Sequence, residues 1–336
     1  MGIGTIPLPG RGRISLAALA VIPAAMSYPW RGSRDQYLAG IAVLLVFALF
    51  GFWRGMHFTT ILRRRLEMLH RRLSSEPMEA GLHTAALLRI GLPACDRELF
   101  PVPLLARYLN RYGLRADAIR ITCRADTTGL QEVWIGITIS AERNLAALRA
   151  RSPRVPLEQA AAAAARRLAD YLREAGWEVG SVSTEDPPRL ITNAAREKWR
   201  GVLNRDSECI AAYQVDVDAN LPETLTAIWS YPARETWTAL EFSDCGRSES
   251  GLTIAVACAF RTDDLPDSRA PLAGLVPHYG HQWRALEALH PASTQLLGGH
   301  SDILKDRLAG LKWPSASGPS VGSHRLEGTA PGLVDS

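Results

Sequence analysis

The last part of the chain carries a G-x-S-x-G sequence, formed by Gly318, Ser320 and Gly322. In α/β-hydrolases this spacing places a nucleophilic serine on a sharp turn between a strand and a helix. Here Pro319 interrupts the motif, and the sequence from about Pro314 onward is rich in Ser, Gly and Pro with few large apolar residues, which is typical of disorder. Because a disordered tail does not supply a packed turn, the sequence argues against a catalytic Ser320.

Four histidines lie close together in sequence and suggest a transition-metal site. The candidate ligands are His278, His281, His290 and His300, with Cys245 or Cys258 as a further ligand. Imidazole and thiolate suit such metals, but His278-x-x-His281 lacks the helical H-E-x-x-H frame, and Pro277 and Gly280 indicate a surface loop. The sequence therefore favours solvated histidines over a metal centre, and no cofactor is expected.

Two pairs of aspartates are the remaining candidates for acid–base chemistry. Asp216 and Asp218 lie on the polar face of an expected strand, while Asp263 and Asp264 lie in an expected loop beside Pro266. Solvation accounts for all four. The sequence contains neither a P-loop Gly-Lys-Ser or Gly-Lys-Thr nor a dinucleotide fingerprint after a strand. We therefore expect no small-molecule substrate and no enzymatic activity.

Composition limits the class of protein further. Of 336 residues, 47% are hydrophobic and 21% are charged, enough for one sizeable domain or two small ones with hydrophobic cores. The net charge of +4 comes largely from one arginine-rich segment, so no nucleic-acid partner is indicated. The five cysteines are odd in number and lack C-x-x-C spacing, which fits a reducing compartment.

Two apolar segments without charged residues, Ile14 to Trp30 and Gln36 to Trp53, predict a transmembrane helix hairpin over residues 14–53. At about 1.5 Å per residue, each segment of about 17 residues is just long enough to cross a thin hydrocarbon core. The connection from Arg31 to Asp35 is too short to fold alone, so the helices run antiparallel. A cleaved signal peptide over Ile14 to Met26 is the alternative, and it would leave the second span in place.

Basic residues predict the orientation of this hairpin, because arginine close to a span resists translocation. Arg11 and Arg13 precede the first span and a dense cluster follows the second, which outweighs Arg31 and Arg34 in the turn. We therefore expect both termini in the cytosol and the protein in the inner (cytoplasmic) membrane. The residues expected at the interface with the lipid bilayer are Trp30, Trp53, Arg54, Arg63, Arg64 and Arg65.

The hairpin is one of five expected parts of the chain. Residues 1–13 form an N-terminal segment, 54–92 a basic membrane-proximal helix and linker, 93–313 a cytosolic α/β domain and 314–336 a disordered tail. The basic helix is expected over Ile61 to Leu73, where arginines near an anionic leaflet contribute on the order of 1 kcal/mol each.

Period-two alternation predicts the strands of the α/β domain. The expected elements are a short helix over Leu104 to Tyr112, strands beginning at Ala118 and Val133 joined by a Thr128-Gly129 turn, a helix over Pro156 to Ala175 that stops at Gly176, a strand over Trp177 to Val182, a strand over Tyr213 to Val217, a helix capped by Asn220 with Glu223, and strands over Thr236 to Phe242 and Leu252 to Phe260. Hairpins flanked by helices, occurring twice, predict a mixed, mainly antiparallel sheet. Whether the two halves share one sheet stays open.

Six segments between Ile14 and Gly299 resemble, in the same order, the EccE family of type VII (ESX) secretion systems, and most closely its short ESX-3 form. They are FWRGMHFTT, RYGLRADAIRI, EVWIGITISAERNLAALRAR, LADYLREAGW, IWSYPARETWTALEF and ALEALHPASTQLLGG. The resemblance implies a structural subunit of the mycobacterial inner-membrane complex that exports proteins, together with EccB, the ATPase EccC and the vestibule subunit EccD. It transfers no catalytic motif.

Several positions recur in this resemblance, and we interpret them as core packing and helix capping rather than partner contacts: Trp134, Asn144, Arg151, Trp229, Glu235 and Trp237. Two other functions stay open. A membrane-tethered enzyme would show a polar pocket with converging His, Asp or Cys, and an adaptor that docks a soluble ligand would show an exposed apolar groove.

Overall fold

The computed structural model describes residues 83–302 except 94–99, 152–155, 193, 205–207 and 245–251. It also describes residues 311, 313, 314 and 316 and scattered residues between 19 and 66. The chain divides into two compact units, Met1–Glu76 and Pro77–Ser336.

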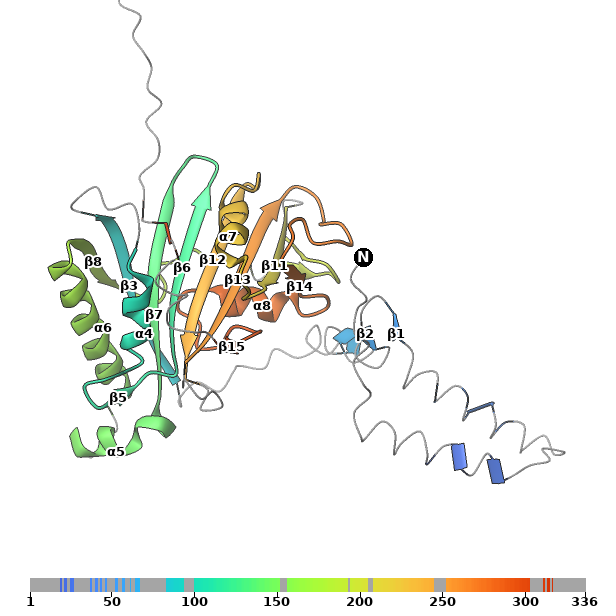
Figure 1. Ribbon diagram of the computed structural model, residues 1–336, viewed down its shortest axis with the longest axis horizontal. Helices are drawn as coiled ribbons and strands as arrows, with labels where there is room; N and C mark the ends of the chain where they lie inside the picture. The colour runs from blue at the N-terminus through green and yellow to red at the C-terminus, as the bar shows by residue number, and fades with distance from the viewer. Residues whose placement is uncertain are drawn as a thin grey trace, which may run out of the picture. The chain divides into compact units, whose positions relative to one another are not determined.

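The second unit is built on one sheet of eleven strands, with the order β8-β3-β7-β6-β12-β13-β11-β10-β9, β14 beside β11 and β15 beside β13 (Figure 1). The strands are β3 (His83–Pro93), β6 (Ala118–Asp126), β7 (Gln131–Ser140), β8 (Trp177–Val182), β9 (Arg196–Glu197), β10 (Val202–Leu203), β11 (Cys209–Val215), β12 (Glu235–Ser243), β13 (Thr253–Thr262), β14 (Leu275–Pro277) and β15 (Ser301–Asp302). The helices are α4 (Val102–Arg107), α5 (Ala141–Arg151), α6 (Leu157–Glu174), α7 (Leu221–Trp229) and α8 (Gln282–Leu289).

The two halves of the domain share this sheet, which answers the question that the sequence left open. Strands β3 and β6 to β8 form one side, and strands β9 to β15 form the other. Strands β6 and β12 join them through nine opposed residue pairs, from Ala118 opposite Ser243 to Asp126 opposite Glu235. Every pairing between described strands is antiparallel. The predicted α/β class with a mainly antiparallel sheet is confirmed.

Alternation along the strands gives the sheet two differently covered faces. On β6, Ile119, Ile121 and Cys123 face a core shared with helices α4, α6 and α7. The residues between them point to the second face, where α8 and the chain after it pack (Figure 1). The second face of the sheet is therefore a second buried layer.

Two tryptophans form the centre of that second layer. Trp134 of β7 and Trp237 of β12 are stacked, with ring centroids 5.9 Å apart and planes at 11°. Both are almost completely buried, at 0% and 1% exposure. Aromatic pairs of this kind dominate the area that a core removes from water.

Helix α6 is close to its prediction, and its sequence explains it. Ala161, Leu168 and Leu172 recur at helical spacing and are buried against the sheet. Gly176 follows the helix with φ of 87°, a left-handed conformation that glycine adopts without steric cost. Strand β8 then begins at Trp177, as predicted.

Three local features differ from expectation. The helix predicted over 104–112 ends at Arg107, because the chain turns back through Tyr112 and Gly113, whose φ values are 57° and 70°, between β4 (Asn110–Arg111) and β5 (Leu114–Arg115). Asn220 precedes α7 as predicted, but its side chain makes no capping hydrogen bond and lies 3.5 Å from Asp218 instead. Strand β3 occupies part of the range expected to be a linker, because its Leu88 and Ile90 are buried in the core.

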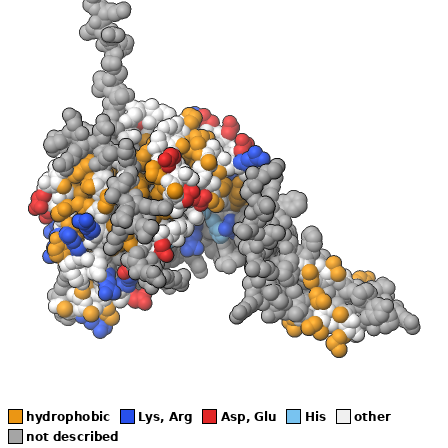
Figure 2. Space-filling model, viewed as in Figure 1, with side chains coloured by type: hydrophobic (Ala, Val, Ile, Leu, Met, Phe, Trp, Pro, Cys, Tyr) orange, Lys and Arg blue, Asp and Glu red, His pale blue; other side chains and the backbone are white. Residues whose placement is uncertain are grey.

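On the face of the molecule seen in Figure 2, acidic and basic side chains of the described residues are interspersed. This mixture fits the modest net charge of +4. Neither sign forms a continuous field on the described part of that face.

Most of the predicted transmembrane hairpin lies outside the described residues. Those that are described between 19 and 46 are helical, and Phe52–Trp53 forms strand β1 paired with β2 (Met56–His57). Residues 61 and 64–66, within the predicted basic helix, are helical. Among the described residues, no helix combines the length and the apolar character needed to cross a membrane.

Candidate functional site

The chain after α8, residues 290–300, lies against the second face of the sheet and is called the covering loop here. Its closest approach is at Gly136 in β7, where a Cβ atom would stand 2.3 Å from the carbonyl oxygen of Pro291. No side chain fits that distance, so glycine is needed where the loop backbone meets the sheet. The covering loop is thus part of the packed domain.

An ion pair beneath the covering loop joins it to the sheet. The guanidinium of Arg120 on β6 binds the carboxylate of Glu241 on β12, with Nε 2.9 Å from Oε2, and the two side chains are 3% and 0% exposed. Arg120 Nη1 also donates to the carbonyl oxygens of His290 at 3.0 Å and Ser293 at 3.3 Å. The arginine therefore satisfies both the carboxylate and the loop backbone.

Glu241 makes the complementary contacts to the same loop. Its Oε1 accepts a hydrogen bond from the Leu297 N–H at 2.9 Å and lies 3.0 Å from Nε2 of His300. Burial alone would raise the pKa of Glu241, but the Arg120 charge and the hydrogen bonds from His300 and Leu297 outweigh burial and lower that pKa. A carboxylate held ionised with this set of partners fixes the loop and is not poised as a general base.

A second set of charges crosses the same face as an alternating chain. Its members, in order of contact, are Arg89, Glu132, Arg124, Glu235, Arg261, Glu208, Arg234 and Asp263. The more buried middle part includes Arg261 Nε, which lies 2.6 Å from Glu235. Burial would raise the pKa of Glu235, but hydrogen bonds from Arg124 and Arg261 lower it overall. Because each charge has an opposite neighbour, the set is structural in character.

The lowered pKa values of Glu235 and Glu241 predict a loss of stability in acid. Both groups contribute stability that is fully present above the unfolded-state pKa of about 4.3 and lost as the pH falls through their lower folded-state values. We expect the Tm of the domain to decrease below about pH 4.3, and Glu235→Gln to be less stable than wild type at pH 7 but less dependent on pH. Thermal unfolding followed by circular dichroism measures both. Glu223→Gln, at an exposed position, is the control. If the Tm of Glu235→Gln decreased with falling pH as steeply as that of wild type, this prediction would be contradicted.

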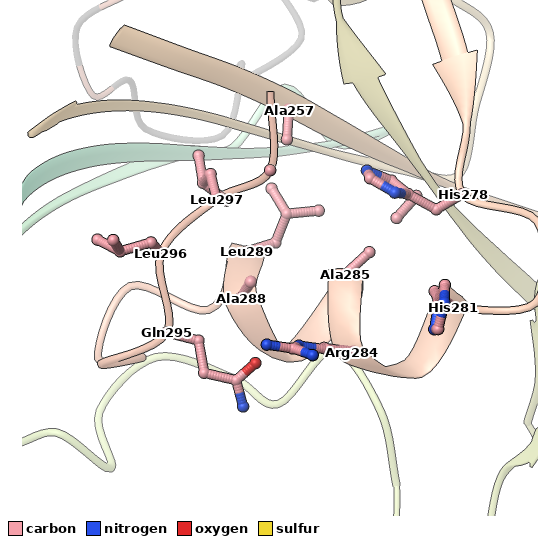
Figure 3. Close-up of a pocket in the computed structure, with 12 residues that line it drawn as sticks. Ala257, His278, His281, Arg284, Ala285, Ala288, Leu289, Gln295, Leu296 and Leu297 are labelled. Atoms are coloured by element: carbon pink, nitrogen blue, oxygen red, sulfur yellow. The ribbon is translucent and has the colours of Figure 1, made fainter. Parts of the chain in front are cut away.

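A hollow of about 230 Å³ lies beside α8 and is the main candidate for a binding site (Figure 3). It is called the histidine hollow because His278 and His281 line it together with Arg284. His281 directly precedes α8, and His278 follows β14, so the short turn between strand and helix brings both histidines to one place. Alanines and leucines of the sheet, α8 and the covering loop form most of the rest, together with Gln295 and Gly298 of the loop.

A neighbouring hollow of about 310 Å³ lies on the other side of α8. It is lined by apolar residues such as Leu190, Ile191 and Trp283, with Arg189 and Glu287 of opposite charge. Trp283 Nε1 donates to Glu287 at 2.7 Å, so the acidic group already has a partner.

The four histidines do not come together as one metal site. His278 and His281 line the histidine hollow, His290 lines the neighbouring one, and His300 contacts Glu241. Among the described residues, no group of three or more His, Cys, Asp or Glu is placed to hold a metal. Cys258 lies in the core on the opposite face, where burial raises its pKa, and Cys245 is outside the described residues.

The aspartate pairs are exposed, as the sequence predicted. Asp216 and Asp218 are at the surface, and Asp218 accepts a hydrogen bond from the Asn220 N–H at 2.8 Å. Asp263 lies 2.6 Å from Arg234, and Asp264 is exposed. The carboxylate of Asp218 thus stabilises a turn and that of Asp263 an ion pair. Strand β11 ends at Val215, so Asp216 and Asp218 lie beyond the strand that was expected to carry them.

The remaining predicted site residues fall mainly outside the described part. Ser320, Trp30, Arg54 and Arg63 are among those not described. Trp53 lies in β1, and Arg64 and Arg65 are helical. The expected membrane-interface role of the tryptophans and arginines stays a prediction, and so does the argument against a catalytic Ser320.

The positions that recur in the family resemblance have structural roles where they are described. Trp134 and Trp237 are stacked in the core, and Trp229 contacts Trp313 edge-on at 5.7 Å. The Asn144 amide binds the Arg115 backbone N–H and carbonyl at 2.8 Å each, and Glu235 belongs to the charge chain. Core packing is confirmed for Trp134 and Trp237. That these positions serve packing and helix capping rather than partner contact stays a prediction, and the Arg151 side chain is not described.

Comparison with known proteins gives the family of this antiparallel α/β domain. A family model described as "Putative type VII ESX secretion system translocon, EccE" matches residues 127–246. The "ESX-3 secretion system protein EccE3" of Mycobacterium tuberculosis (strain CDC 1551 / Oshkosh) is 50% identical over 317 residues, 94% of this chain and 95% of that protein. The protein of the same name from Mycolicibacterium smegmatis is 42% identical over 287 residues, 85% and 90% of the two chains. The chain belongs to the EccE family of type VII secretion proteins, which confirms the resemblance.

Proposed function

We propose that this protein is a structural subunit of an ESX-3-type secretion complex, anchored in the inner membrane with its α/β domain in the cytosol. The observation that carries the proposal is the identity of 50% to an ESX-3 secretion system protein along 94% of the chain. A match that covers both units supports the same role for the whole chain rather than for one shared domain.

Exposed apolar side chains in the first unit support its role as an anchor. Leu19, Ile22 and Met26 are 72%, 57% and 81% exposed, and Ile41 and Val43 are 56% and 71% exposed. Such side chains gain free energy when lipid or another apolar surface covers them. In the proposal, residues 14–53 span the bilayer as a hairpin, and the aromatic and basic residues at its ends lie at the interface.

The proposed partners are the membrane subunits EccB, EccC and EccD. Helices in lipid gain little from apolar contact alone, so the hairpin would pack on a partner through small residues such as Ala17, Ala18, Gly40 and Ala48. The α/β domain supplies a second contact, and two linked contacts reinforce one another through effective concentration. With one contact in the membrane and one in the cytosol, the protein would hold the neighbouring subunits in a fixed arrangement.

This arrangement predicts the outcome of copurification from cells that make the complex. We expect the full chain to recover EccD well in mild detergent, and a fragment starting at Pro77 to be soluble but to recover EccD at least tenfold less, since it keeps one of two linked contacts. Immunoblots of EccD at matched expression levels measure the difference.

A matched control separates membrane tethering from specific packing. It replaces residues 14–53 with an unrelated two-helix hairpin, which keeps the second unit at the membrane, and recovery is expected to lie between those of the other two proteins. If the fragment from Pro77 and the full chain recovered EccD equally, the proposed role of the hairpin in assembly would be refuted.

The histidine hollow favours an adaptor that docks a soluble ligand as a second function. It is open to solvent, and its described lining has no carboxylate or thiol to act with His278 and His281 as a catalytic set. Its volume of about 230 Å³ is below the roughly 300–1,000 Å³ of pockets for small molecules and cofactors. Binding of a small group therefore fits this hollow better than the enzyme alternative.

A further inference from the structure

Small side chains make the floor of the histidine hollow apolar and leave it unfilled. Ala212 of β11 and Ala257 of β13 are 0% and 5% exposed, and they face Ala288, Leu289 and Leu297, which are equally buried. Larger side chains at the alanine positions would fill the space, as they do elsewhere in the core. An aliphatic group that enters such a space is removed from water and gains contacts.

Nitrogen-bearing side chains stand at the mouth of the same hollow. Arg284 is exposed and His278 and His281 are half-buried. Figure 3 shows the two histidines on the side opposite Leu296 and Leu297, and Arg284 beside Gln295. None of the described residues that line the hollow is acidic. Because a guanidinium is always charged and matches a carboxylate geometrically, the mouth suits an anionic oxygen group.

The apolar floor and the basic mouth of the histidine hollow together restrict the chemistry of a ligand. The apolar part of the ligand must be buried, and its negative charge must stay near the surface. The hollow, at about 230 Å³, has room for about one residue. The last residue of a polypeptide combines an aliphatic side chain and a free carboxylate on one Cα atom, whereas an internal glutamate would carry its charge into the apolar floor.

We infer that the histidine hollow binds the C-terminal residue of a polypeptide whose last side chain is aliphatic. Arg284 pairs with the terminal carboxylate, and the side chain occupies the space between Ala257, Ala285 and Ala288. The inference does not rest on membership in a secretion complex, because it concerns a site within the second unit alone and is tested on the isolated full chain.

Isothermal titration calorimetry of the full chain in detergent, with short peptides as probes, tests this site. N-acetyl-Gly-Gly-Leu with a free carboxylate is expected to bind about tenfold more tightly than its C-terminal amide, since a charge-assisted hydrogen bond is lost in the amide. N-acetyl-Gly-Leu-Gly, which has the same composition with glycine last, and acetate are both expected to bind about tenfold more weakly than the first peptide. Acetate binding as tightly as that peptide would show a simple anion site and overturn the inference.

Three variants locate the binding. Arg284→Gln is expected to remove the preference for acid over amide, and Ala285→Leu, which fills the hollow on a helix that tolerates leucine, is expected to abolish binding of both peptides. Arg269→Gln removes another exposed arginine and is expected to change neither affinity. Unchanged circular dichroism of the variants shows that they are folded. The absence of binding to wild type, or an acid preference that survives Arg284→Gln, would refute the inference.

Discussion

Replacing Glu241 with alanine is expected to destabilise the domain by about 3–5 kcal/mol, because removal of one partner leaves a buried charge uncompensated. Arg120 is only 3% exposed, so bulk solvent has little access to replace the carboxylate. The covering loop also loses the acceptor of the Leu297 N–H and the contact to His300. The corresponding decrease in Tm is about 10 °C for a domain of this size.

A double substitution separates the burial of charge from loss of packing. Arg120→Met with Glu241→Leu removes both charges and keeps apolar volume, so it is expected to cost less than Glu241→Ala alone. Thermal unfolding measures stability, and hydrogen exchange is expected to show loss of protection in residues 290–300 in the single variant. Exposed Glu223→Ala on α7 serves as the control. A Tm within about 2 °C of wild type for Glu241→Ala would mean that the ion pair does not hold the loop.

The sequence predicted those elements whose pattern is local. Strand β8 and helix α6 lie almost where the periodicity placed them, because the apolar stripe of α6 and the stop at Gly176 are both encoded by neighbours in the chain. The hairpin of β6 and β7 was also recognised, since the strands alternate around a turn at Gly129, whose φ is 81°.

The covering of the second face was not predictable from alternation alone. Arg120 alternates with apolar residues as a solvent-exposed arginine does, and its partner Glu241 lies 121 positions away. Nothing local distinguishes an exposed polar face from one that a distant loop covers. The closest signal in the sequence was Gly136 between Ile135 and Ile137, since a glycine inside a strand often marks a close backbone approach.

Strand β3 and the end of α4 differed from expectation for similar reasons. Residues 83–93 follow a Ser- and Pro-containing segment that is typical of linkers, and only pairing with β7 and β8 makes them a sheet strand. After Arg107 the apolar spacing continues to favour a helix, but Tyr112 adopts a φ of 57°, which local propensity does not predict for a bulky residue.

The candidate site was predicted in part. The sequence singled out His278 and His281 as neighbours in a surface loop, and the structure places both at the mouth of one hollow. Arg284 and the alanine floor were missed, because they come from α8 and from strands far apart in sequence. Only the fold makes these residues adjacent.

Trp237→Ala is expected to have the second large effect, a loss of about 3–5 kcal/mol of stability, which is typical of truncating a buried tryptophan. Trp237 is 1% exposed and stacks on Trp134 at 5.9 Å, so its removal leaves a cavity beside a ring that has lost its partner. The cavity lies under the charge chain, whose Arg124 is opposite Trp237 in the strand register. The surrounding side chains therefore have little freedom to collapse into it.

Trp237→Phe distinguishes lost apolar volume from lost hydrogen bonding. The indole Nε1 of Trp237 has no hydrogen-bond partner among the described residues, so phenylalanine removes an unsatisfied donor while it keeps most of the ring contact. We expect it to cost about 1–2 kcal/mol, well below the alanine variant. Denaturant unfolding measures both values, and Leu265→Ala, at a side chain that is 38% exposed, is expected to stay within about 1 kcal/mol of wild type. If Trp237→Phe destabilised the domain as much as Trp237→Ala, the indole N–H would have a partner that stabilises the fold, and packing of the two rings would not be the main contribution.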